Sequence, residues 1–165
     1  MDGQRIYLDT SILLPFIDPN APKDEKRHSK SVIYDAARLK DRHNFKVIVP
    51  QIVLGELFLK LESISHEVIG AFDEVRRLVD EYPAVTTEIA KLALRLAEID
   101  HFLKIEFNDA LILAHALNDA HSTYFITTES KIIRSSRLVE EATKLQHEGL
   151  RKVRLTITDS LKRKG

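Results

Sequence analysis

Short apolar runs rich in β-branched and aromatic residues alternate with longer helical stretches along this chain, and few architectures accommodate that order. The strand candidates are residues 6–8, 47–49, 123–126 and 153–157. Apolar residues at helical spacing predict helices over about 26–40, 50–61, 65–82, 86–97 and 108–120. This alternation favours an α/β fold with a central, mainly parallel β-sheet of four or five short strands flanked by α-helices. In such a sheet a binding site is expected beyond the carboxyl ends of the strands.

The chain has 165 residues, and we expect a single domain over residues 1–160 followed by a basic tail at residues 161–165. The absence of cysteine excludes disulfides, zinc–thiolate sites and iron–sulfur clusters, so any metal must be held by oxygen or histidine. Asp9 interrupts the first apolar stretch, residues 6–17, and a secretory signal or membrane span would not tolerate that charge. We therefore expect a cytoplasmic protein with no membrane contact.

Charge is unevenly distributed, although the net charge is zero. Residues 1–121 carry 15 basic and 20 acidic residues, whereas residues 122–165 carry 10 basic and 5 acidic residues. Basic side chains after Ser122, notably Arg134 and Arg137, could face RNA phosphates or the acidic groups of a protein inhibitor. A solvated surface with a basic tail explains the same asymmetry, so charge alone leaves both interpretations open.

Acidic residues stand at the places where the predicted sheet would form its site. Asp9 directly follows the first strand, and Glu129 follows the strand at 123–126. Glu56 lies on the helix after the second strand, and Asp109 opens the apolar helix that leads into the third. The topology therefore predicts that these four carboxylates converge in one cleft.

Each acidic residue also has a structural explanation of its own. Asp9 could cap the following helix, because aspartate is a favoured N-cap residue. Glu56 has Lys60 four residues later, a spacing that allows an exposed ion pair. Gly55 weakens that explanation, because a glycine inside a helix suggests the close approach of another group. Asp109 would be favourable at a helix N-terminus, but a charge at the start of a buried helix is harder to dismiss.

A cluster of carboxylates suits a hard divalent cation. Mg²⁺ and Mn²⁺ prefer carboxylate and water oxygens, and substrate phosphate often completes the shell. Such a cation relieves the mutual repulsion of the acids, activates a water molecule and stabilises negative charge in the transition state. The cluster therefore predicts hydrolysis of a phosphodiester.

Four short motifs occur in order along most of the chain: Tyr7-Leu8-Asp9-Thr10-Ser11, Gly55-Glu56-Leu57, Asn108-Asp109-Ala110-Leu111-Ile112-Leu113-Ala114 and Thr127-Thr128-Glu129. Together they resemble the PIN-domain nucleases, especially the VapC-like toxins of toxin–antitoxin pairs. The first and third motifs are the most specific, whereas a lone glutamate on a helix would mean little.

The resemblance implies a PIN-like fold and an Mg²⁺- or Mn²⁺-dependent endoribonuclease. It assigns the catalytic and metal-binding carboxylates to Asp9, Glu56, Asp109 and Glu129, with Ser11 and Thr127 as groups that support them. It implies an RNA substrate, which Arg134 and Arg137 would contact. It also implies a small antitoxin as protein partner. Apolar helices in the first half of the chain predict a groove for that partner and a homodimer face.

One residue departs from the family pattern. The family usually has aspartate at the last acidic position, where this chain has Glu129, which is one methylene longer. The longer side chain could still reach the metal through water. It equally permits an alternative function, a catalytically weak PIN-like module that binds RNA or protein without cutting.

Other phosphate chemistries fit less well. A phosphatase with an aspartate nucleophile would need a second aspartate two residues after Asp9, where this chain has Ser11. No Gly-x-x-x-x-Gly-Lys-Ser/Thr segment exists for a P-loop. The seven histidines are scattered, and the closest pairing, His115 with His121, lacks a third ligand for zinc. We interpret them as mostly surface residues.

Overall fold

The computed structural model describes residues 3–99, 106–135, 137–138, 140–141, 144, 148 and 153–161. The strands are β1 (Arg5–Leu8), β2 (Lys46–Ile48), β3 (Ser122–Ile126) and β4 (Thr156–Thr158). The helices are α1 (Thr10–Ile17), α2 (Lys23–His43), α3 (Gln51–Lys60), α4 (His66–Leu78), α5 (Thr87–Ile99), α6 (Phe107–Asn118) and α7 (Ser130–Ile133). The basic residues 162–164 of the predicted tail lie outside the described residues.

The described strands form one four-stranded parallel sheet in the order β2-β1-β3-β4. The chain leaves β1 toward β2 on one side and leaves β3 toward β4 on the other. The carboxyl ends of β1 and β3 therefore meet where the winding direction reverses, the position at which open α/β sheets bind ligands. The mainly parallel α/β sheet flanked by helices is confirmed.

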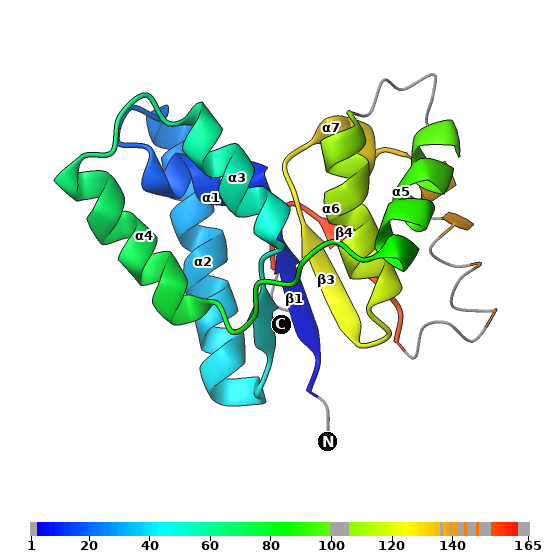
Figure 1. The fold of residues 1–165 in the computed structure, drawn as a ribbon. Coiled ribbons are helices and arrows are strands. Elements are labelled where there is room, and N and C mark those ends of the chain that lie inside the picture. Colours follow the sequence, from blue (N-terminus) through cyan, green and yellow to red (C-terminus); the bar gives the residue numbers. More distant parts are fainter. Residues whose placement is uncertain are drawn as a thin grey trace.

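Helices cover the sheet in two groups (Figure 1). One group contains α1, which packs against α2, α3 and α4. The other contains α6, which packs against α5 and β3. The core between them includes the fully buried side chains of Ile6, Leu8, Ile112 and Phe125. This packing fixes the ends of β1 and β3, from which the acidic site is built.

The helix predicted over residues 65–82 ends earlier, at Leu78. The following residues instead run extended beside β2, where the Asp80 amide donates to the Val47 carbonyl at 2.8 Å and the Val49 amide donates to the Glu81 carbonyl at 3.1 Å. The side chain of Asp80 also accepts a hydrogen bond from the Val47 amide at 2.8 Å. Pairing with the edge strand satisfies backbone groups that the helix would otherwise have used.

Two further expectations need correction. The last strand begins at Thr156 instead of residue 153, because only Thr156–Thr158 pair with β3. His115 is not a surface residue: it is 2% exposed within α6, where burial lowers the pKa of its imidazole. Across the described part of the chain, no helix combines the length and apolar character needed to cross a membrane.

Candidate acidic active site

Asp9 lies at the end of β1, as the N-cap residue of α1, and is 3% exposed. Its side chain makes no capping hydrogen bond to the helix, so the capping explanation is wrong. Instead its Oδ2 atom accepts hydrogen bonds from the Ser11 hydroxyl at 2.9 Å and the Thr127 hydroxyl at 2.7 Å. No described residue donates to Oδ1. The buried carboxylate is thus held by one oxygen and presents the other.

Ser11 and Thr127 form a small hydroxyl network that joins β1 to β3. Their hydroxyls lie 3.3 Å apart. The Thr128 amide donates to the Ser11 hydroxyl at 3.0 Å, and the Glu129 amide donates to the Thr127 hydroxyl at 3.1 Å. These bonds set the backbone path after β3, and with it the position from which Glu129 projects.

Glu56 projects from α3 with a side chain that is 11% exposed. Its Oε1 accepts a hydrogen bond from the Thr10 hydroxyl at 3.3 Å, and its Oε2 lies 3.7 Å from the Lys60 ammonium. Burial raises the pKa of Glu56, Lys60 opposes that rise, and the charge of Asp9 adds to it. The ion pair with Lys60 therefore exists, but Glu56 also faces the carboxylate of Asp9.

The neighbouring Gly55 does not behave as expected. No atom lies within 4 Å of the place where a Cβ would stand, so no close approach explains this glycine. Nothing in the structure accounts for it.

Asp109 lies in the first turn of α6 and is half-buried. A helix N-terminus favours the charged form of a carboxyl. Nevertheless the pKa of Asp109 rises to about 7, first through burial and then through the charges of Asp9, Glu129, Glu56 and Glu106. Asp109 therefore lies in the electrostatic field of all three other predicted metal-binding carboxylates.

Glu129 is the N-cap residue of α7, and its side chain is exposed and makes no capping bond. Among the described residues, no three histidine or acidic side chains are close enough to share one ion as they stand. Mg²⁺ commonly binds through one or two carboxylates and keeps several waters, so a looser ring of acids still suits it. The donor set, all carboxylate oxygen, is that of a hard cation.

The two predicted RNA-contacting arginines follow this segment. Arg134 is the C-cap residue of α7, and both Arg134 and Arg137 are exposed. Their position beyond Glu129 leaves them accessible to a ligand in solution.

Three further site residues were not identified from the sequence. The Thr10 hydroxyl donates a hydrogen bond to Glu56. Glu106 is the N-cap residue of α6 and adds to the pKa of Asp109, and Thr128 binds Ser11 through its backbone. The Asp-Thr-Ser order offered a signal for Thr10, whereas Glu106 and Thr128 become visible only when distant segments are brought together.

Comparison with known proteins identifies the family and the fold of the chain. The PIN domain family model matches residues 6–148. No curated protein matches the chain significantly. Among solved structures, a chain in the crystal structure of VapBC2 from Rickettsia felis, bound to a DNA fragment from their promoter, superposes with a TM-score of 0.58 at 16% identity. The match covers 93% of this chain and 98% of that chain. The profile match over most of the sequence, together with the shared fold, shows that the chain belongs to the PIN-domain family, whose members are generally nucleases.

Proposed function

We propose that the chain is an endoribonuclease that hydrolyses RNA phosphodiester bonds with Mg²⁺ or Mn²⁺, and that it is the toxin of a toxin–antitoxin pair in the cytoplasm. The observation that carries the enzymatic part is the pKa of Asp109, which burial and the charges of Asp9, Glu129 and Glu56 raise to about 7. Crowded carboxylates at the carboxyl ends of two parallel strands suit a divalent cation and a phosphate substrate.

Asp9, Glu56, Asp109 and Glu129 would hold the cation. When bound, it would supply a water of lowered pKa and positive charge for the phosphate oxygens. The chain itself orients the acids: Ser11 and Thr127 hold one oxygen of Asp9 and leave the other open. Thr10 and Lys60 position Glu56 through its two oxygens, Thr10 at Oε1 and Lys60 at Oε2.

The test is cleavage of structured and unstructured RNA by the purified chain with Mg²⁺, with Mn²⁺ and with EDTA. Asp109→Asn keeps the shape of the side chain and removes its charge, so cleavage should fall at least about a hundredfold. Asp41→Asn is the matched control, because Asp41 is an exposed residue near the end of α2. Cleavage by Asp109→Asn at the parental rate would contradict the proposal.

Glu129 motivates the second candidate, a catalytically weak module that binds RNA or protein. Its side chain is exposed, and only its backbone is fixed by Thr127. Glu129→Asp restores the family residue, and we expect this variant to cut RNA at least as fast as the parent, measured with Mn²⁺. A parent that binds RNA without cutting it, combined with a Glu129→Asp variant that cuts, would favour the second candidate.

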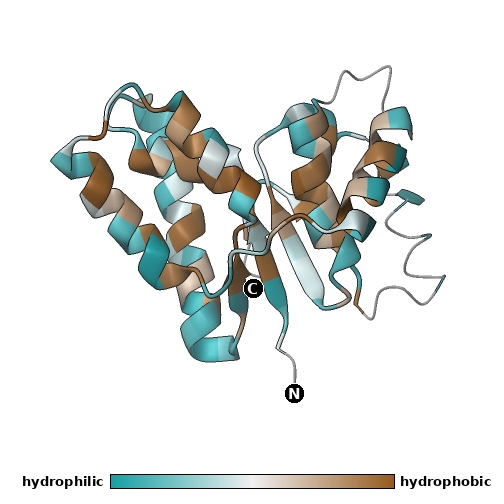
Figure 2. Ribbon diagram, in the orientation of Figure 1, coloured by the Kyte–Doolittle hydropathy of each residue, from teal (hydrophilic) through white to brown (hydrophobic). Residues whose placement is uncertain are grey.

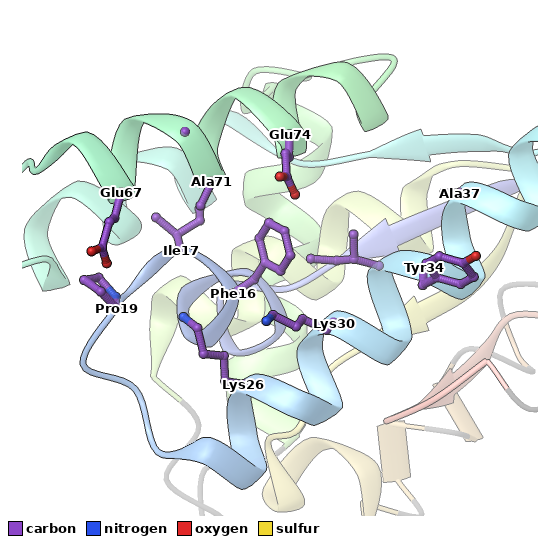
Figure 3. Close-up of a pocket in the computed structure, with 12 residues that line it drawn as sticks. Phe16, Ile17, Pro19, Lys26, Lys30, Tyr34, Ala37, Glu67, Ala71 and Glu74 are labelled. Atoms are coloured by element: carbon purple, nitrogen blue, oxygen red, sulfur yellow. The ribbon is translucent and has the colours of Figure 1, made fainter.

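The partner proposal is supported by a cavity of about 720 Å³ between α1, α2 and α4, shown in Figure 3. Phe16, Ile17 and Ala71 give it an apolar lining. Lys26 and Lys30 approach from α2, whereas Glu67 and Glu74 lie on α4. We propose that an amphipathic segment of the antitoxin, apolar on one face with charges along both edges, occupies this groove. The solved VapBC2 structure with a similar fold holds such a pair of proteins.

The homodimer proposal is supported by exposed apolar side chains at the end of α3 and the start of α4. We call them the α3–α4 apolar set: Phe58, Leu59, Ile64 and Ile69. Figure 2 shows hydrophobic segments on both helices. Leu59 is the most exposed of the four, at 88%. Exposed apolar side chains that are grouped together mark surfaces that associate with another protein.

A further inference from the structure

A second cavity of about 600 Å³ lies directly beside the acidic site, and we call it the flanking cavity. It shares Ser11 and Thr128 with the hydroxyl network under Asp9. It also shares Lys60 with Glu56, whose carboxylate lies 3.7 Å from the Lys60 ammonium. A group in this cavity would therefore lie next to a phosphate that is held at the acidic site.

The lining of the flanking cavity has two chemical zones. Leu14 and Pro15 of α1 supply apolar surface, and His28 of α2 lines the same cavity. His28 is held in place because its Nε2 donates to the Asp159 carbonyl at 2.7 Å, beyond the end of β4. A fixed imidazole ring in a cavity that also has apolar lining residues offers a stacking surface for a flat heterocycle.

The second zone is made of hydrogen-bond acceptors. Asp24, Glu25 and Asp159 are the acidic residues of the lining, and among the described lining residues Lys60, at the edge shared with Glu56, is the one lysine or arginine. Their negative charges disfavour a phosphate beside them, whereas Lys60 favours a phosphate at its edge. The interior suits a neutral group that donates hydrogen bonds.

We propose that the flanking cavity binds the nucleobase next to the scissile phosphate of single-stranded RNA, a proposal that rests on the ribonuclease function proposed above. The phosphate lies at the Lys60 edge and the base stacks on His28 inside. Cavities of roughly 300–1,000 Å³ bind small ligands, and this one falls in that range. The carboxylates accept hydrogen bonds from exocyclic amino groups, so adenine, cytosine and guanine are preferred over uracil, which has no exocyclic amino group.

Cleavage-site mapping on a random-sequence RNA pool with Mn²⁺ tests this base preference. Among the sites that the parent cuts, uridine should be about tenfold rarer at one of the two nucleotides that flank the cut. A tenfold difference is the effect expected of one charged hydrogen bond. Asp159→Asn supplies an amide donor for a uracil carbonyl and should reduce that depletion to about threefold or less. His28→Ala should raise KM more than it lowers kcat. Asp41→Asn and His43→Ala, exposed substitutions on α2 outside the cavity, are the matched controls.

A binding measurement separates failure of this proposal from failure of the proposed function. Fluorescence anisotropy at low salt compares labelled oligocytidylate with oligouridylate, whose bases have the same ring size and differ at the amino group. The Asp109→Asn protein should bind oligocytidylate about tenfold more tightly, and Asp109→Asn/Asp159→Asn should lose that preference. If the parent cuts no RNA, the ribonuclease proposal fails, and the cytidine preference still decides the role of the cavity.

Two results would overturn the proposal. One is that neither cleavage nor binding shows a base preference that changes in the Asp159→Asn variant. The other is that Asp159→Asn and His28→Ala weaken inhibition by a co-expressed antitoxin but leave the choice between cytidine and uridine unchanged. In that case the cavity receives a protein side chain.

Discussion

Asp109 should make the stability of the metal-free protein depend on pH. Its pKa is about 7 in the folded protein and 3.8 in the ordinary reference state, so the folded state holds more protons between these values. The free energy of unfolding therefore falls as pH rises from about 4 to 7, by at most ~1.4 kcal/mol per pH unit and by less where solvent screens the charge. Denaturant unfolding in EDTA across that range measures the slope.

The matched variants for this measurement are Asp109→Asn and Asp41→Asn. Asp109→Asn should remove most of the slope. The remainder combines Glu56, whose raised pKa gives a slope of the same sign, with His115, whose lowered pKa gives a slope of the opposite sign. Asp41→Asn should retain the parental slope. Mg²⁺ should restore stability near pH 7 to the parent but not to Asp109→Asn, because it binds the folded site. A parental slope in Asp109→Asn would show that other groups cause it.

Gly55 is a second test at single-residue scale. It lies inside α3, and a Cβ would meet no atom within 4 Å. Gly55→Ala should therefore raise the free energy of unfolding by about 0.5–1 kcal/mol, because alanine loses less backbone entropy in a helix. Urea denaturation measures this change. Destabilisation would contradict the open space that surrounds this position in the structure.

At the scale of elements, the four strands and the major helices could be predicted from the sequence, because apolar periodicity follows directly from which face each element buries. The end of α4 could not, since it depends on Asp80 reaching a strand that precedes it by 33 residues. Caps were less predictable still. Asp9 occupies the N-cap position, yet its carboxylate binds hydroxyl groups that the sheet brings to it.

The site residues also divide into those that could be predicted from the sequence and those that could not. The motifs pointed to the four carboxylates through a family resemblance, and the order of the strands explains why they can face one another. The bond from Thr10 to Glu56 joins residues that are 46 positions apart, so no local pattern could reveal it. Contacts of this kind depend on how the helices pack against the sheet.

The groove between α1, α2 and α4 yields a prediction about one helix. Gly70 lies inside α4 and lines the groove, and a Cβ there would meet no atom within 4 Å. Gly70→Leu should preserve the helix but fill part of the groove. Co-expression with the product of a neighbouring antitoxin gene should then give weaker complex formation on size-exclusion chromatography, while RNA cleavage by the variant stays parental. Gly70→Ala should have a smaller effect.

The control for this experiment is Gly55→Ala. It adds the same methyl group as Gly70→Ala, but on α3 and outside the groove. It should bind the antitoxin as the parent does. A complex with Gly70→Leu as stable as the parental one would place the antitoxin on another surface.

At the scale of the whole molecule, the α3–α4 apolar set should govern association. We expect the parent to be a dimer at micromolar concentration, because standard interfaces bury roughly 800 Å² per partner and apolar side chains dominate their centres. Leu59 is 88% exposed, so Leu59→Glu leaves the fold intact but places a charge in the interface. Sedimentation velocity should show a monomer for Leu59→Glu. Val85→Glu, a charge at an exposed apolar residue outside the set, should remain dimeric. A parent that is monomeric throughout this range, or a Leu59→Glu variant that stays dimeric, would exclude this surface as the dimer interface.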